Sequence, residues 1–121
     1  MDTVTTPEST YEEMATELAQ DGVRFALGAW VDVLGRAKSK LVPIEHLAEM
    51  VAGSERYTPR GMGDLGRMNP VEDECVAMPD PTTMVRLPWD RRVVMMSADL
   101  LVDGREPWEN CPRSILKAVL E

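Results

Sequence analysis

The sequence VRFALGAWVDVLGRAKSKLV, residues 23–42, decides the fold of this chain. Its first half is apolar at every second residue from 23 to 33, and this period of two is typical of a half-buried β-strand. A Leu-Gly pair then leaves two residues for a reversal, and RAKSKLV follows with Lys38 and Lys40 on one side. The stretch therefore predicts a β-hairpin whose second strand is exposed and charged, with both lysines solvated.

Helical patterns lie on both sides of this hairpin. STYEEMATELAQDG, residues 9–22, opens with a serine that has a glutamate three residues on, which is a capping box, and it ends at a glycine. PIEHLAEMVAGS, residues 43–54, begins with a proline and carries apolar residues at helical spacing. Both segments predict amphipathic helices, and residues 1–8 are expected to form a disordered tail.

The second half of the chain alternates apolar segments with turns. Residues 74–78 and 83–89 predict two short strands separated by the turn PDPT, whose prolines exclude a helix. Residues 91–102, RRVVMMSADLLV, are apolar on both faces over most of their length and predict a central strand. A last helix begins at Pro112, and nothing in the sequence covers its apolar face. That face consists of Ile115, Leu116, Val119 and Leu120.

A long connection without any period separates the two halves. Residues 54–73 form a loop of about 20 residues, whereas connections in compact domains are usually about 4 to 6 residues long. The order is therefore helix, hairpin, helix, long loop, two or three strands, helix. This order predicts one α+β domain over residues 9–121, a β-grasp-like mixed sheet with helices packed on one face.

Composition narrows the range of partners. The chain has 121 residues, enough for one hydrophobic core, with 21 acidic and 13 basic residues. An acidic surface repels phosphate backbones and anionic lipids, so neither nucleic acid nor a membrane is expected as a partner. The first residues show neither the basic region nor the apolar region of a signal peptide, so a cytoplasmic location is expected.

Cysteine, histidine and tryptophan are expected to play structural roles. Cys75 and Cys111 are too few for a disulfide scaffold or a four-thiolate metal site, and are predicted to be reduced structural thiols. His46 is the single histidine and is expected on a helix surface. The tryptophans are expected in the core or at subunit contacts, because no aromatic residue alternates with a basic patch. They are Trp30, Trp89 and Trp108.

Three segments resemble glutamine synthetases, in the order of that family. VDVLGRAKSKLVP resembles the first hairpin, CVAMPDPTTMVRLPW the strand that runs into a Pro-Asp turn, and DLLVDGREPWENCPRSILKAVL the segment with Pro-Arg-Ser before a helix. The resemblance covers about residues 23–120 and only the N-terminal β-grasp domain of the family. It is greatest to type III glutamine synthetases and γ-glutamylmethylamide synthetases, which use ATP to join glutamate to ammonia or a small amine.

The resemblance implies that a larger C-terminal catalytic domain, which in the family holds the metal ions and the nucleotide, is absent from this sequence. The residues agree, because the chain has no Gly-rich phosphate-binding loop after a strand and no paired histidines. ATP and Mg²⁺ or Mn²⁺ are therefore expected in the missing domain, and no cofactor or metal is expected here. The isolated chain is expected to be inactive, and the full-length enzyme to be a homo-oligomer.

The candidate site residue is Asp64, in GMGDLG within the long loop. In the family this loop closes over the catalytic domain of a neighbouring subunit, where an aspartate in Asp-Gly-Ser-Ser helps to bind ammonium. No Asp-Gly-Ser-Ser occurs between Ser54 and Asp80, and Asp64 is the acid among the glycines. Because an amine arrives as a cation and must lose a proton before it attacks an acyl phosphate, a carboxylate suits this place. The alternative is that Asp64 only forms a turn.

Other charged residues are weaker candidates. Glu72, Asp73 and Glu74 could reinforce a cation site, and Arg91 and Arg92 could contact an acidic partner subunit. For both groups, solvated surface charge is the alternative. The whole chain also has an alternative function, as a stand-alone acidic β-grasp module that acts through protein association and catalyses nothing.

Overall fold

A computed structural model of the chain describes residues 7–32, 34–57, 75–102 and 106–121. The elements in chain order are α1 (Pro7–Gln20), β1 (Phe25–Val31), β2 (Ala37–Pro43), the 3-10 turn η1 (Ile44–His46), α2 (Leu47–Val51), β3 (Arg56–Tyr57), β4 (Cys75–Arg86), β5 (Val93–Val102), β6 (Glu106–Pro107) and α3 (Pro112–Leu120). Helix α1 begins at Pro7, before the predicted start at Ser9, because a proline at the first helical position has no N–H to leave unpaired. Residues 1–6 of the predicted tail lie outside the described residues.

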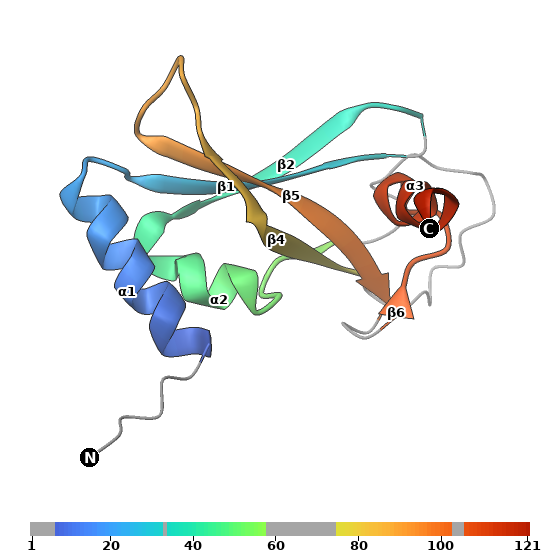
Figure 1. Cartoon of the computed structure of the whole chain (residues 1–121), viewed down its shortest axis with the longest axis horizontal. Coiled ribbons are helices and arrows are strands. Elements are labelled where there is room, and N and C mark those ends of the chain that lie inside the picture. Colours follow the sequence, from blue (N-terminus) through green and yellow to red (C-terminus); the bar gives the residue numbers. More distant parts are fainter. Residues whose placement is uncertain (1–6, 33, 58–74, 103–105) are drawn as a thin grey trace.

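One mixed sheet organises the domain (Figure 1). Its strands follow the order β2-β1-β5-β4-β3, and β6 adds to β5. The central strands β1 and β5 are parallel, whereas every other pair is antiparallel. Helices α1 and α2 cover one face, so the predicted α+β class with a β-grasp-like sheet is confirmed.

The predicted hairpin is confirmed, and a buried carboxylate holds its turn. Asp32 accepts hydrogen bonds from the backbone N–H groups of Leu34 and Arg36, both at 2.9 Å, and from Nε of Arg36 at 3.0 Å. Burial favours the neutral acid at Asp32, but the hydrogen bonds from Arg36 and Leu34 outweigh it and lower the pKa of Asp32. The lysines of β2 are less solvated than predicted: Lys38 lies 4.0 Å from Asp32, and Lys40 lies 3.5 Å from Glu55.

Strand β4 corrects the prediction of two short strands separated by a turn. It runs without interruption from Cys75 to Arg86 and contains a register shift between Asp80 and Val85 where it pairs with β5. Proline is tolerated here because, among the described residues, β3 pairs with β4 only at Val76 and Cys75 and no described strand needs N–H donors along the rest of that edge. Two short strands, β3 and β6, were not predicted.

The core forms two clusters along one face of the sheet. The first packs α1 and α2 against β1 and β5, and the second packs β4, β5 and the segment before α3. The first contains Ala15, Val23, Ala26, Ile44, Leu47, Met50, Val94 and Met96. The second contains Trp30, Cys75, Ala77, Ala98, Leu100, Trp108 and Cys111. Since side chains alternate along a strand, the residues between these core positions point to the opposite face, which we call the open face.

Candidate functional site

The acids predicted to bind an amine lie outside the described residues. Asp64, Glu72, Asp73 and Glu74 all fall between β3 and β4, in residues 58–74. The described ends of that segment are neighbours, because Tyr57 pairs with Cys75 at the edge of the sheet. Chemistry within the described residues must therefore be sought elsewhere.

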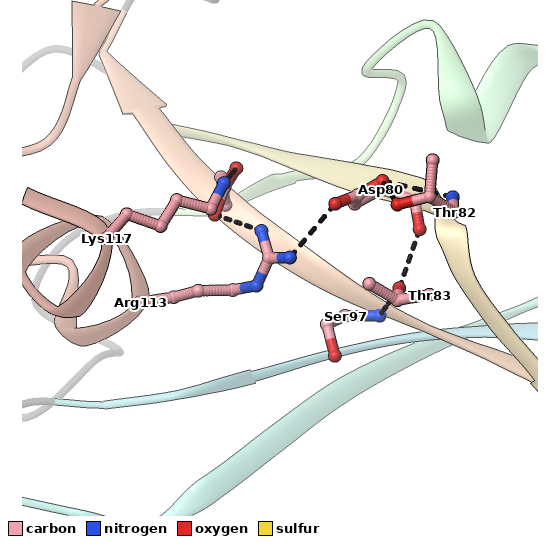
Figure 2. A network of polar contacts seen from close by, with 7 residues as sticks. Asp80, Thr82, Thr83, Ser97, Arg113 and Lys117 are labelled. Carbon is pink, nitrogen blue, oxygen red and sulfur yellow. Dashed lines mark hydrogen bonds and ion pairs between the residues drawn. The ribbon is translucent and has the colours of Figure 1, made fainter. Parts of the chain in front are cut away.

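A network of ion pairs and hydrogen bonds joins α3 to the sheet (Figure 2). We call it the Arg113 cluster; it consists of Asp80 on β4, Asp99 on β5, and Arg113 and Lys117 on α3. The Nη1 atom of Arg113 lies 2.6 Å from Asp99 and its Nη2 atom 3.0 Å from Asp80. Lys117 lies one helical turn further on, and its Nζ atom is 2.5 Å from Asp99.

Asp80 also organises the irregular part of β4. Its Oδ1 atom accepts hydrogen bonds from the N–H and the hydroxyl of Thr82, at 3.0 and 2.6 Å. The hydroxyl of Thr83 donates to the backbone oxygen of Asp80 and accepts from the N–H of Ser97 on β5, at 2.6 and 2.8 Å. Asp80 therefore connects the register shift of β4 to β5 and to α3.

These contacts decide what the cluster can do chemically. Hydrogen bonds from the side chains of Thr82 and Arg113 lower the pKa of Asp80, although its partial burial acts in the opposite direction. A carboxyl group with a lowered pKa and several donors is a poor proton donor at neutral pH. The two carboxylates face two cations, so the cluster is neutral and serves to hold elements together.

Sequence reasoning missed this cluster as a site. It noted the Pro-Asp turn and the Pro-Arg-Ser segment as family features and assigned no contact to Asp80 or Arg113. An available signal was the Asp-Pro-Thr pattern, because an aspartate followed two residues later by an N–H donor is typical of an Asx turn. The partnership with Arg113 had no local signal, since the two residues are 33 positions apart.

Helix α3 leaves most of its apolar side exposed. Arg113 and Lys117 reach the sheet, while none of the helix's residues is buried. The predicted uncovered face is confirmed in the described structure: Ile115 and Leu116 are 51% and 57% exposed, and Val119 and Leu120 are 76% and 75% exposed. A groove of about 390 Å³ beside α3 is lined by Trp30, Ala98, Pro112, Arg113 and Leu116, among others.

The open face of the sheet is also apolar at its surface. Leu41, Val31 and Val85 are 53%, 45% and 50% exposed, and strand alternation places them opposite the two core clusters. Exposed apolar side chains scattered singly are ordinary, but here they occur on three strands and on α3. This side of the domain therefore resembles a contact surface.

The remaining sequence candidates have mostly structural surroundings. Cys75 and Cys111 are buried in the second cluster and are not joined in a disulfide, and Trp30 and Trp108 lie in the same cluster, as predicted. Trp89, in the connection between β4 and β5, is 80% exposed and so does not lie in the core.

The histidine and the two arginines that the sequence singled out lie on the surface or in ion pairs. His46 is half-exposed and lies 3.4 Å from Glu49, and Arg92 forms an ion pair with Asp90 at 2.9 Å. Arg91 is exposed. Within the described ranges, no group of three or more His, Cys, Asp or Glu side chains is placed to hold a metal ion. No helix among the described residues is long and apolar enough to span a membrane.

Known proteins resemble this chain in sequence. No family model matches the chain. It is 29% identical over 108 residues to a glutamine synthetase of Rhizobium meliloti (strain 1021), and this match covers 89% of the chain and 24% of that protein. It is also 29% identical over 104 residues to a glutamate–methylamine ligase of Methyloversatilis universalis, covering 86% of the chain and 23% of that protein.

Solved structures also resemble this chain in fold. GmaS in complex with ADP superposes with a TM-score of 0.76 at 31% identity, over 90% of this chain and 25% of that one. A further glutamine synthase homologue, with a TM-score of 0.64 at 22% identity, supports the fold alone. The resemblance predicted from three segments is thus confirmed, and the chain spans about a quarter of the length of the relatives it matches.

Proposed function

We propose that this chain, a homologue of glutamine synthetases and glutamate–methylamine ligases, is the N-terminal β-grasp domain of an enzyme that joins glutamate to ammonia or a small amine using ATP. The observation that carries the proposal is the match to GmaS, which extends over 90% of the chain with a TM-score of 0.76 at 31% identity.

The exposed apolar surfaces support a role as part of a larger assembly. Burying a large apolar side chain stabilises a protein by roughly 1.5 to 3 kcal/mol, so an uncovered apolar helix face is costly. The face of α3 and the exposed side chains of the open face offer such surfaces. In the proposed enzyme, a catalytic domain and a neighbouring subunit of a homo-oligomer would cover them.

The chemistry proposed for this domain is binding of the amine. Asp64 would attract the ammonium form by its charge and accept a proton before the nitrogen attacks γ-glutamyl phosphate, in a pocket completed by the neighbouring subunit. The described residues offer no metal site, so Mg²⁺ or Mn²⁺ and ATP would be bound by the catalytic domain, and no step involving them is assigned to this chain.

A first experiment addresses the chain alone. The purified 121-residue chain should form no γ-glutamyl hydroxamate from glutamate, ATP and hydroxylamine above a protein-free blank. The glutamate–methylamine ligase of Methyloversatilis universalis serves as the positive control. Product formation by the isolated chain would contradict the assignment of metal and nucleotide binding to another domain.

A chimera tests whether this chain can serve as the N-terminal domain of an active ligase. The segment of that ligase which this chain matches is replaced by this chain, and ATP-dependent amide formation is measured with ammonia and with methylamine. Asp64→Asn in the chimera should raise KM for the amine by roughly 10- to 150-fold, because one hydrogen bond to a charged group is worth about 1.5 to 3 kcal/mol. KM for glutamate and ATP should change little.

A control variant shows whether the effect of Asp64→Asn on KM is specific to that position. Glu109→Gln removes an exposed acid next to the buried Trp108 and should leave all three KM values unchanged. If Asp64→Asn changed KM equally for all three substrates, Asp64 would only form a turn. A folded, assembled chimera without activity, together with a parent enzyme that is active, would favour the stand-alone interaction module.

A further inference from the structure

Helix α3 is attached to the sheet in an unusual way. A surface helix normally buries its apolar stripe and exposes its charged side. In α3 the charged side faces the sheet, because Arg113 and Lys117 both contact carboxylates there, and the apolar stripe is more than half exposed. Apolar burial therefore contributes little to holding this helix.

The connection before α3 does not fix the helix either. Trp108 and Cys111 are buried in the second cluster and anchor the chain up to the start of the helix. From Pro112 onward no residue of the helix is buried, and Leu116 contributes only one side of the groove beside Trp30. The placement of α3 on the sheet thus depends on the Arg113 cluster.

The guanidinium group is well suited to this task. Its planar fork offers several N–H donors, and here two of its nitrogens reach carboxylates on two different strands. The contact to Asp80 also depends on the irregular part of β4, because Thr82 holds the same carboxylate through its other oxygen. One side chain therefore joins α3, β4 and β5.

We infer that Arg113 is the positioning residue of α3, which the Arg113 cluster rather than apolar packing holds on the sheet. Loss of the cluster releases the helix while the sheet and the α1–α2 side stay folded. The inference concerns the described residues of this chain alone and does not depend on the ligase function. Its consequence is that the cluster decides where the apolar face of α3 points, and so which surface a partner meets.

Hydrogen exchange of the backbone amides in the 121-residue chain tests the inference. Arg113→Met keeps much of the side-chain stem and removes the charge. The amides of residues 115–120 should exchange about 10-fold faster in this variant, since charged hydrogen bonds are worth more than 1 kcal/mol but partial exposure reduces their effect. Arg113→Lys keeps the charge without the fork and should give an intermediate rate. Amides of β4, β5 and α1 should keep their protection.

Arg92→Met is the matched control, because Arg92 also forms an exposed ion pair, with Asp90, at a site distant in sequence from α3. It should change the rates of α3 by less than about twofold. Unchanged protection of α3 in Arg113→Met would overturn the inference, because packing would then suffice. Equal loss across β4, β5 and α3 would overturn it too, because the cluster would then stabilise the whole domain.

Salt provides a second measurement that requires no variant to fold. Between about 0.02 M and about 0.5 M NaCl the Debye length falls from roughly 20 Å to about 4 Å, which weakens partly exposed ion pairs. The amides of α3 in the unmodified chain should exchange several-fold faster at the higher salt concentration, whereas those of β5 should not. Salt-independent protection of α3 would contradict the inference, even if Arg113→Met could not be purified.

Discussion

Two regions of the same sheet hold their helices by different forces. Helices α1 and α2 lie over one end, where Ala15, Leu47 and Met50 pack against Ala26 and Met96 in the first core cluster. Helix α3 lies near the other end, where no residue of the helix is buried and the Arg113 cluster makes the contacts (Figures 1 and 2). Amphipathic sequence alone therefore does not reveal which side of a helix its own domain will cover.

The strands beneath the helices explain the difference. Where α1 and α2 pack, β5 presents Val94 and Met96, which are 2% and 0% exposed. Where α3 lies, β4 and β5 present the carboxylates of Asp80 and Asp99. A cationic helix side meets an anionic sheet surface there, and the apolar side remains outward for another partner.

The largest expected effect compares the same substitution in both regions. Leu47 on α2 is fully buried, and Leu120 on α3 is 75% exposed. Leu47→Ala should lower the free energy of unfolding by about 2 to 5 kcal/mol, because it removes buried methyl groups and leaves a cavity. Leu120→Ala should change it by less than about 0.5 kcal/mol. Urea unfolding measures both, and equal losses would abolish the distinction between the two regions.

A smaller effect is expected at the register shift that supports Asp80. Thr83→Val replaces a hydroxyl that donates to Asp80 and accepts from the N–H of Ser97. The variant should lose about 1 to 3 kcal/mol of unfolding free energy, because a partly buried N–H loses its acceptor. Thr16→Val, which removes an exposed hydroxyl bonded to the backbone oxygen of Glu12, is the control and should be nearly neutral. A neutral Thr83→Val would show that water replaces the hydroxyl.

The outward apolar side of α3 should make the isolated chain associate weakly. Size-exclusion chromatography with light scattering should give an apparent mass that rises with concentration, and Leu120→Glu should reduce this rise. Leu34→Glu is a suitable control, because Leu34 is similarly exposed, at 63%, but lies in the hairpin turn. A strictly monomeric chain whose α3 amides are strongly protected would show that the helix face needs no partner.

The smallest expected effect is that of pH. The hydrogen bonds from Thr82 and Arg113 lower the pKa of Asp80 in the folded chain, so its ionised form stabilises the attachment of α3. That contribution is complete above the unfolded pKa of about 3.9 and is lost as pH falls through the lowered value. The amide chemical shifts of α3 should therefore change in acid before those of α1. Asp80→Asn should move this change to neutral pH, and a change shared by α1 and α3 would show only global unfolding.

Much of the fold followed from local patterns. The alternation in residues 23–33 and the helical spacing in residues 43–54 predicted the hairpin and the second helix, although that helix opens with the turn η1. The predicted break at PDPT was wrong, because β4 continues through its prolines along an edge that the described part of β3 pairs with only at Val76 and Cys75. Strands β3 and β6 have two residues each, too few to show any period.

The candidate sites also differ in how far the sequence could predict them. Asp64 was singled out by chemistry and family resemblance, lies outside the described residues, and stays a prediction. The Arg113 cluster could not be found from spacing, because its ion pairs join residues 14, 18 and 33 positions apart in two strands and a helix.

The sequence by itself determined that α3 would be amphipathic and that its apolar residues would share a side, because side chains three and four positions apart lie together on any α-helix. Only the tertiary structure decided which side meets the sheet. That choice depends on the carboxylates of β4 and β5, which strand pairing brings together at Asp80 and Asp99. A local period encodes the shape of an element, whereas the surface against which the element packs is assembled by residues far away in the chain.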